Sequence, residues 1–104
     1  MKDIDHLEKR RLALQADLDS QKTQAERNRL GQFATPSRLA EDLLTFARLL
    51  LPSREKVRFL DPAIGTGSFY LALAKVFSRR RVKEPLGFEI DPHYGIRFLV
   101  TNYK

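Results

Sequence analysis

The residues best suited to chemistry form a short loop in the middle of the chain. Asp61 ends the apolar run 57–60, and Gly65 and Gly67 follow it closely. Glycine has no Cβ and adopts positive φ readily, so a ligand can approach the backbone of such a loop. Ser68 opens a stretch with helical spacing, which predicts free backbone N–H groups and the positive end of a helix dipole beside that ligand. The pattern predicts a strand, a ligand-binding loop and a helix N-terminus, although an ordinary turn with two glycines would look the same.

Two widespread nucleotide-binding patterns are absent from this loop. The dinucleotide pattern G-x-G-x-x-G fails because its third glycine position is Tyr70, and the phosphate-binding pattern G-x-x-x-x-G-K-[ST] does not occur. Residues 61–69 instead read Asp-Pro-Ala-Ile-Gly-Thr-Gly-Ser-Phe, which resembles motif I of the S-adenosylmethionine-dependent DNA methyltransferases that modify amino groups of bases, adenine N6 in particular. The resemblance implies that the loop wraps the methionine end of the cofactor, whose ammonium and sulfonium suit a carboxylate. The cofactor-binding residues that it implies are Asp61, Pro62, Ala63, Gly65, Gly67 and Phe69.

A second segment with this resemblance precedes the loop. Residues 31–36 read Gly-Gln-Phe-Ala-Thr-Pro, which resembles motif X of the same methyltransferases. The resemblance implies that the segment folds over the methionine moiety and that Phe33 and Thr35 bind the cofactor. From the residues alone, Thr35 is a good N-cap and Pro36 suits the first position of a helix. That helix is predicted to end before Pro52 and to bury an amphipathic stripe made of Leu39, Leu43, Phe46, Ala47 and Leu50.

An acidic residue belongs to the next apolar run. Residues 86–91 predict a second parallel strand, and Glu89 lies 22 residues after Gly67 (89 − 67). Nucleotide-binding α/β folds hold the ribose hydroxyls with an acid at about this offset, and one carboxylate accepts from both hydroxyls. Residues 87–92 also resemble motif II of the family, which implies that Glu89 is the ribose ligand and that Ile90 is a further cofactor-binding residue.

The last part of the chain predicts the start of another helix but no catalytic motif. We interpret Asp91 as the cap of that helix rather than as a neighbour of the adenine, and His93 and Tyr94 as surface residues of its first turn. The family performs its chemistry with motif IV, an Asn or Asp followed by Pro-Pro and an aromatic residue, and that pattern does not occur. We therefore assign no catalytic residue and expect the chain by itself not to methylate DNA. The resemblance covers roughly residues 29–100, which is the cofactor-binding half.

The first thirty residues predict one long polar helix over 3–30. This stretch contains no Pro or Gly, and helix formers dominate it. Four apolar residues fit the a and d positions of a short coiled coil, and Arg11 and Gln21 interrupt that seam. The helix would pair with a second copy or with a complementing chain; packing of the same stripe on the chain's own domain is an equal alternative. The four apolar residues are Ile4, Leu7, Leu14 and Leu18.

Composition limits the class of protein. The 104 residues allow one small domain, and a hydrophobic fraction of 42% is typical of a globular chain rather than a disordered one. No stretch reaches the roughly 18 apolar residues of a membrane span, and without cysteine neither a disulfide framework nor a thiolate zinc site can form. We expect a cytoplasmic protein without a metal site. The net charge is +6, of which residues 31–104 contribute +5 (12 − 7); it suits a polyanionic partner, DNA in the full-length enzyme.

These observations predict an α/β fold in two parts. Residues 1–30 form the N-terminal helix. Residues 31–104 form an incomplete S-adenosylmethionine-binding domain, the N-terminal part of a Rossmann-like class I methyltransferase fold with parallel strands and flanking helices. The resemblance implies an adenine-N6 DNA methyltransferase of the restriction–modification type. Two other interpretations stay open: a non-catalytic fragment that regulates or pairs with another chain, and a methyltransferase of the same fold that acts on RNA or on protein glutamine.

Overall fold

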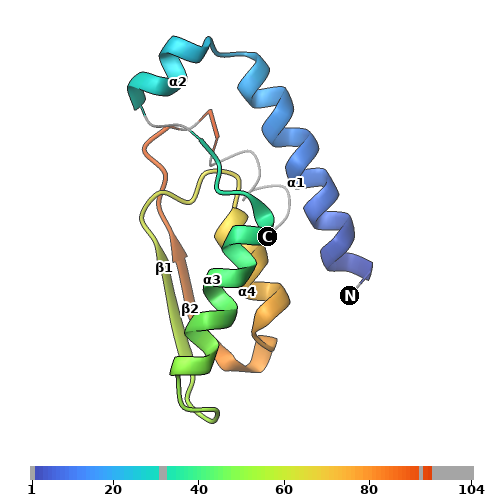
Figure 1. The fold of residues 1–104 in the computed structure, drawn as a ribbon, viewed down its shortest axis with the longest axis vertical. Coiled ribbons are helices and arrows are strands. Elements are labelled where there is room, and N and C mark those ends of the chain that lie inside the picture. Colours follow the sequence, from blue (N-terminus) through green and yellow to red (C-terminus); the bar gives the residue numbers. More distant parts are fainter. Residues whose placement is uncertain (1, 31–32, 92, 95–104) are drawn as a thin grey trace.

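The computed structural model of the protein describes residues 2–30, 33–91 and 93–94 (Figure 1). This part of the chain is a mixed α/β structure with helices and a small parallel sheet of two strands, which confirms the predicted class. In Figure 1 the strands lie on one side of the α3–α4 pair and α1 lies on the other. No helix within the described ranges is long and apolar enough to cross a membrane. The elements are α1 (Lys2–Ser20), α2 (Gln24–Leu30), α3 (Ser37–Leu50), β1 (Val57–Asp61), α4 (Ser68–Val76), a 3-10 helix (Arg79–Arg81) and β2 (Val82–Gly87).

β1 and α4 form where the sequence predicted a strand and a helix N-terminus. α4 begins directly after Gly67, whose φ of 94° and ψ of 34° lie in the left-handed region that glycine adopts without strain. Phe59 of β1 meets Tyr70 of α4 edge-on, with 6.2 Å between the ring centroids. One face of α4 is the centre of the core. Its fully or almost fully buried side chains are Leu71, Ala72, Leu73 and Phe77, joined by Ile64 from the loop.

β2 lies earlier in the chain than the strand that we predicted over 86–91. It spans Val82–Gly87 and pairs in parallel with β1. Pro85 is compatible with this pairing because of the direction of its nitrogen. The N–H of Phe88 donates to the carbonyl of Asp61 (2.9 Å), and in a parallel ladder alternate residues donate to the same neighbour. Pro85 is an odd number of residues from Phe88, so its nitrogen faces the other edge of the strand, where a proline is tolerated.

The apolar stripe of α3 is not buried as we predicted. Four of its five residues, Leu39, Leu43, Phe46 and Leu50, are between 48% and 69% exposed, and only Ala47 is half-buried. α3 instead packs along α4 through the neighbouring face, which contains the fully buried Ala40. A small residue at the contact lets two helices approach closely, so the packed face is displaced by one position from the stripe.

The first thirty residues form two helices rather than the single helix predicted over 3–30. α1 ends at Ser20 and α2 begins at Gln24. The break coincides with a capping box, in which the N–H of Glu26 donates to Thr23 Oγ1 (3.1 Å) and the N–H of Thr23 donates to Glu26 Oε1 (3.2 Å). α1 contacts α4, and Leu18 of the predicted pairing seam is fully buried within the chain. In this structure the seam therefore faces the chain's own domain.

Candidate functional site

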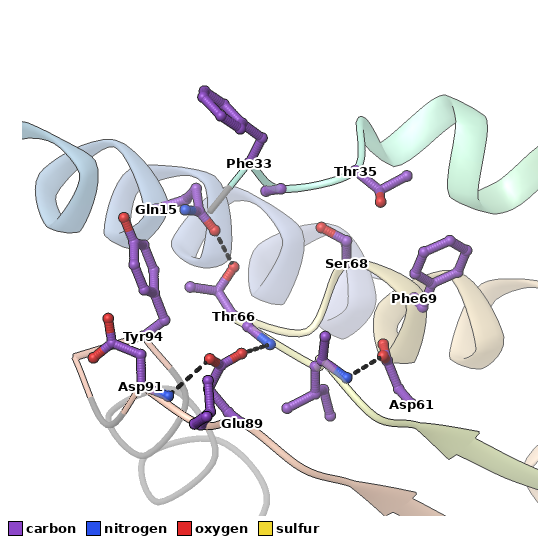
Figure 2. Close-up of a pocket in the computed structure, with 15 residues that line it drawn as sticks. Gln15, Phe33, Thr35, Asp61, Thr66, Ser68, Phe69, Glu89, Asp91 and Tyr94 are labelled. Carbon is purple, nitrogen blue, oxygen red and sulfur yellow. Dashed lines mark hydrogen bonds between the residues drawn. The ribbon is translucent and has the colours of Figure 1, made fainter. Parts of the chain in front are cut away.

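A cavity of about 580 Å³ lies at the carboxyl ends of both strands, the edge where parallel α/β sheets bind ligands (Figure 2). Its wall comes from the loop 61–69, from residues 89–91 with Tyr94, from the segment 33–35 and from Gln15 of α1. Among the cofactor-binding residues predicted from the sequence, Pro62 and Gly67 do not line the cavity. The others do: Phe33, Thr35, Asp61, Ala63, Gly65, Phe69, Glu89 and Ile90.

The backbone N–H groups of the loop are largely used inside the protein. Those of residues 63, 64, 65 and 67 all donate to oxygen atoms of the chain, at 2.9 to 3.0 Å. Our expectation of free N–H groups therefore does not hold for these four residues. A phosphate site at a helix N-terminus depends on such donors, so the loop before α4 offers fewer of them than its glycines suggest. The acceptors, in the same order, are Asp61 Oδ1, Phe88 O, Glu89 Oε1 and Ile64 O.

Glu89 joins the loop to the segment that follows β2. Its Oε1 accepts the N–H of Gly65 (2.9 Å) and its Oε2 accepts the N–H of Asp91 (3.0 Å), as Figure 2 shows. Each carboxylate oxygen has two acceptor positions, so each can still accept one hydroxyl proton. The carboxylate is thus held in place by the backbone and has the capacity to bind a vicinal diol.

The cavity is acidic although the chain as a whole is basic. Asp61, Glu89 and Asp91 line it, and no Lys or Arg side chain is among the lining residues that the structure describes, whereas the net charge of the chain is +6. Asp91 also accepts the N–H of His93 (2.9 Å), the hydrogen bond that a helix cap makes, and pairs with Lys22 Nζ (2.6 Å). A cavity with this lining favours a cationic ligand and disfavours an anionic one.

Gly87 allows β2 and the loop to come close together. A Cβ at this position would lie 2.2 Å from Cδ1 of Ile64 and 3.1 Å from its Cβ. Because Ile64 is only 5% exposed, we expect Gly87→Ala to lower the free energy of unfolding by about 1–3 kcal/mol, as overpacking does. Urea denaturation measures this loss, and adding Ile64→Val, which removes the nearest atom, should recover part of it. Equal stability of Gly87→Ala and wild type would show that Ile64 moves aside.

The segment 33–35 lies across the cavity from Glu89 (Figure 2). The guanidinium of Arg27 stacks on the ring of Phe33, 4.9 Å from its centroid, and in Figure 2 the ring points away from Glu89. Pro36 is the N-cap of α3, which corrects our assignment of Thr35 to that role. Residues 31–32, which belong to the predicted motif X segment 31–36, lie outside the described residues, as do residues 92 and 95–104 of the predicted domain.

Sequence reasoning missed the contribution of α1 and of Tyr94. Gln15 lines the cavity, and the hydroxyl of Thr66 donates to its Oε1 (2.6 Å). Tyr94, which we interpreted as a surface residue, is 4% exposed and donates its hydroxyl proton to Asp19 (2.8 Å). Burial and this hydrogen bond raise the pKa of Tyr94 to about 12, so the hydroxyl stays protonated at neutral pH. For α1, the sequence did contain a signal. Arg11 is a charged residue at a position where a coiled coil needs an apolar one, which indicates that this face of the helix packs on something other than a second helix.

No protein-family model matches the chain, and no solved structure matches it significantly. Among the described residues, no group of three His, Cys, Asp or Glu side chains is arranged to hold a metal ion. The functional conclusion therefore depends on the cavity and on the motifs that meet there.

Proposed function

We propose that the cavity binds S-adenosylmethionine and that the chain is the cofactor-binding part of an adenine-N6 DNA methyltransferase of the restriction–modification type. The observation that carries this proposal is that three separate segments meet at one cavity. The segments that resemble motifs X, I and II span 31–36, 61–69 and 87–92, and residues from each of them line the cavity, within 33–35, 61–69 and 89–91. The resemblance implies this convergence, since in the family the three motifs hold one cofactor molecule.

The charge of the cavity supports a cationic nucleoside. S-adenosylmethionine carries an ammonium and a sulfonium, and the carboxylates of Asp61 and Glu89 offset positive charge at this end of the fold. The third carboxylate, Asp91, is already paired with Lys22. Nucleotides with several phosphates would meet the same carboxylates, and the N–H groups of residues 63, 64, 65 and 67 already donate within the chain. The lining thus favours S-adenosylmethionine over ATP or a nicotinamide dinucleotide.

The ribose and the adenine of the cofactor have matching partners after β2. Glu89 has capacity to accept both ribose hydroxyls, because the backbone N–H groups occupy only one position on each of its oxygens. Ile90 lines the cavity and is 98% exposed. An apolar side chain left open beside the cavity suits the face of a nucleobase.

Exposed apolar side chains on the sheet support a larger Rossmann-like fold. Parallel sheets are normally covered on both faces. Leu60 and Leu86 lie opposite each other in neighbouring strands, yet they are 63% and 54% exposed. In the proposed fold, further strands and helices would continue the sheet and cover this face.

The proposed reaction transfers the methyl group of the sulfonium to the exocyclic amine of adenine. The S–CH₃ bond breaks as the N–CH₃ bond forms, the sulfur becomes a neutral thioether, and the amine nitrogen loses a proton. Such a reaction depends chiefly on holding the two reactants in line. The residues described here would hold the cofactor only, because the sequence contains no Asn/Asp-Pro-Pro-aromatic motif to hold the target base.

Calorimetric titration of the chain tests this proposal. We expect S-adenosylmethionine to bind with one site per chain, and ATP and NADH to produce no binding heat at the same concentrations. We also expect no transfer of a labelled methyl group from the cofactor to DNA by this chain alone. Absence of S-adenosylmethionine binding by a chain that circular dichroism shows to be folded would refute the proposal.

The alternative of a non-catalytic pairing fragment receives less support. The seam predicted for pairing packs within the chain at Leu18, so pairing through residues 3–30 would require α1 to leave its place. The choice of DNA over RNA or protein glutamine as the methyl acceptor rests on the resemblance of the three motifs. Methyl transfer by the full-length enzyme to each kind of acceptor distinguishes these substrates.

A further inference from the structure

Helix α1 presents a row of polar side chains toward the rest of the chain. Glu8, Arg11, Gln15 and Asp19 recur at i, i+3, i+7 and i+11, so they share one face of the helix. Each of them forms a hydrogen bond with a residue outside α1: Ser37, Thr66, Thr66 and Tyr94, in that order. α1 is therefore docked by specific polar contacts, with the buried Leu18 beside them.

Arg11 is the most buried member of this row, with 1% of its side chain exposed. Its Nη1 donates to Thr66 Oγ1 (3.1 Å), and its Nη2 donates to Glu8 Oε1 (3.1 Å) and to Ser37 Oγ (3.0 Å). Partial burial by itself raises the pKa of Glu8, but hydrogen bonds from Ser37 and Arg11 and the charge of Arg11 outweigh it and hold that pKa below its usual value. Glu8 is thus the ionised partner of Arg11 at neutral pH. One guanidinium joins α1 to the start of α3 and to the glycine loop.

Gln15 extends the row into the cavity (Figure 2). Its Oε1 accepts the hydroxyl proton of Thr66 (2.6 Å), and its Nε2 donates to Asp19 (3.0 Å), which also accepts from Tyr94. A carboxamide has two donor hydrogens and two acceptor positions, so one of each is left to bind a ligand. Thr66 is only 2% exposed and has two partners on α1. The shape of the loop at Thr66 therefore depends on the docking of α1.

We propose that α1 completes the ligand site: Gln15 contacts the bound ligand, and Arg11 is a positioning residue that holds Thr66 and the loop in the ligand-binding shape. The identity of the ligand, S-adenosylmethionine, rests on the proposed function. Docking of α1 and occupancy of the cavity stabilise each other, because a coupling between two events acts equally in both directions. The buried Nε of Arg11 has no hydrogen-bond partner among the described residues. This unpaired donor lowers the free energy gained when α1 docks. Contacts between α1 and the ligand would therefore raise the stability of the docked helix by a measurable amount.

The test combines hydrogen exchange with titration of S-adenosylmethionine into the full chain. Arg11→Met is compared with Arg10→Met, which removes an equal charge from the exposed neighbouring position. In the wild type we expect the ligand to slow exchange in residues 2–20 as well as in the loop 61–67. If Arg11 had only a structural role, adding the ligand would not change the exchange of residues 2–20. Arg11→Met should bind about tenfold more weakly, within the range usual for coupled sites, and its ligand-free loop should exchange faster. Arg10→Met should behave as the wild type does.

Two further variants keep the test decisive if Arg11→Met does not fold. Arg11→Lys keeps the charge but lacks the fork that reaches several acceptors at once, so its affinity should fall between those of the wild type and Arg11→Met. Gln15→Ala should also weaken binding. Gln21→Ala should not, because Gln21 is exposed, follows the end of α1 and does not line the cavity. Wild-type affinity in both Arg11→Lys and Gln15→Ala would overturn the inference.

The outcomes separate this inference from the proposed function. If the wild type binds S-adenosylmethionine, equal affinity in Arg11→Met without ligand-dependent protection of residues 2–20 overturns the inference and leaves the proposed function intact. If the wild type binds none, the proposed function and the coupling to this ligand both fail. The ligand-free comparison still decides the positioning role, because unchanged exchange of the loop 61–67 in Arg11→Met would refute it.

Discussion

Replacement of Glu89 with glutamine should weaken S-adenosylmethionine binding by about 100-fold or more. The carboxylate accepts the N–H groups of Gly65 and Asp91, one on each oxygen. Glutamine has a single carbonyl oxygen, so its NH₂ group would face one of these N–H donors. The proposed bonds to the ribose hydroxyls would weaken as well, because hydrogen bonds to a charged group contribute about 1.5–3 kcal/mol each. Loss of about 3 kcal/mol corresponds to about a 100-fold change in the dissociation constant.

Glu84→Gln is the matched control for this measurement. Glu84 lies on β2, is half exposed and pairs with Arg58 at 3.6 Å, away from the cavity. Exposed ion pairs contribute little, so we expect this variant to retain the wild-type dissociation constant in calorimetry. Equal dissociation constants for Glu89→Gln and Glu84→Gln would remove Glu89 from the cofactor site.

Replacement of Leu71 with alanine should cause the largest loss of stability. Leu71 is 1% exposed, at the centre of the face of α4 that forms the core. Removal of a buried leucine side chain costs about 2–5 kcal/mol, since contacts are lost and a cavity remains. This is a large share of the roughly 5–15 kcal/mol that stabilises an ordinary domain. Urea denaturation followed by circular dichroism should therefore show a much lower midpoint, or a chain that is partly unfolded without urea.

Leu49→Ala provides the control for the core, because Leu49 lies on α3 and is 76% exposed. We expect its free energy of unfolding to stay within about 0.5 kcal/mol of the wild type, as for most surface substitutions. If both leucines had the same effect, the buried face of α4 would not be the centre of the core, and the packing of α3 against α4 would have to be different.

The central part of the fold and most of the candidate site could be predicted from the sequence. β1, the loop and the start of α4 are determined by neighbouring residues: an apolar run with an acid at its end, then Gly67 at a positive φ directly before the helix. Glu89 was predicted inside a strand over 86–91; it lies two residues after the end of β2, and it lines the cavity as predicted. Local signals suffice here because the strand, the turn and the helix cap each depend on residues a few positions apart.

Other features were decided by tertiary structure. The burial of α3 was predicted one position away from the face that packs, because periodicity shows that a helix is amphipathic but not which residues meet its neighbour. Use of the loop N–H groups by Glu89 and Phe88 could not be predicted, since it depends on how closely β2 approaches the loop at Gly87.

The placement of α1 shows most clearly which features the sequence determines and which depend on tertiary structure. The sequence by itself determined that residues 2–20 are helical and that Arg11 interrupts an apolar seam. It did not determine that Arg11 is buried, because its partner Thr66 is 55 residues away and Gln15 is 51 residues from the same hydroxyl. A charged side chain is buried only where partners offset its loss of hydration, and those partners come together only when the chain has folded.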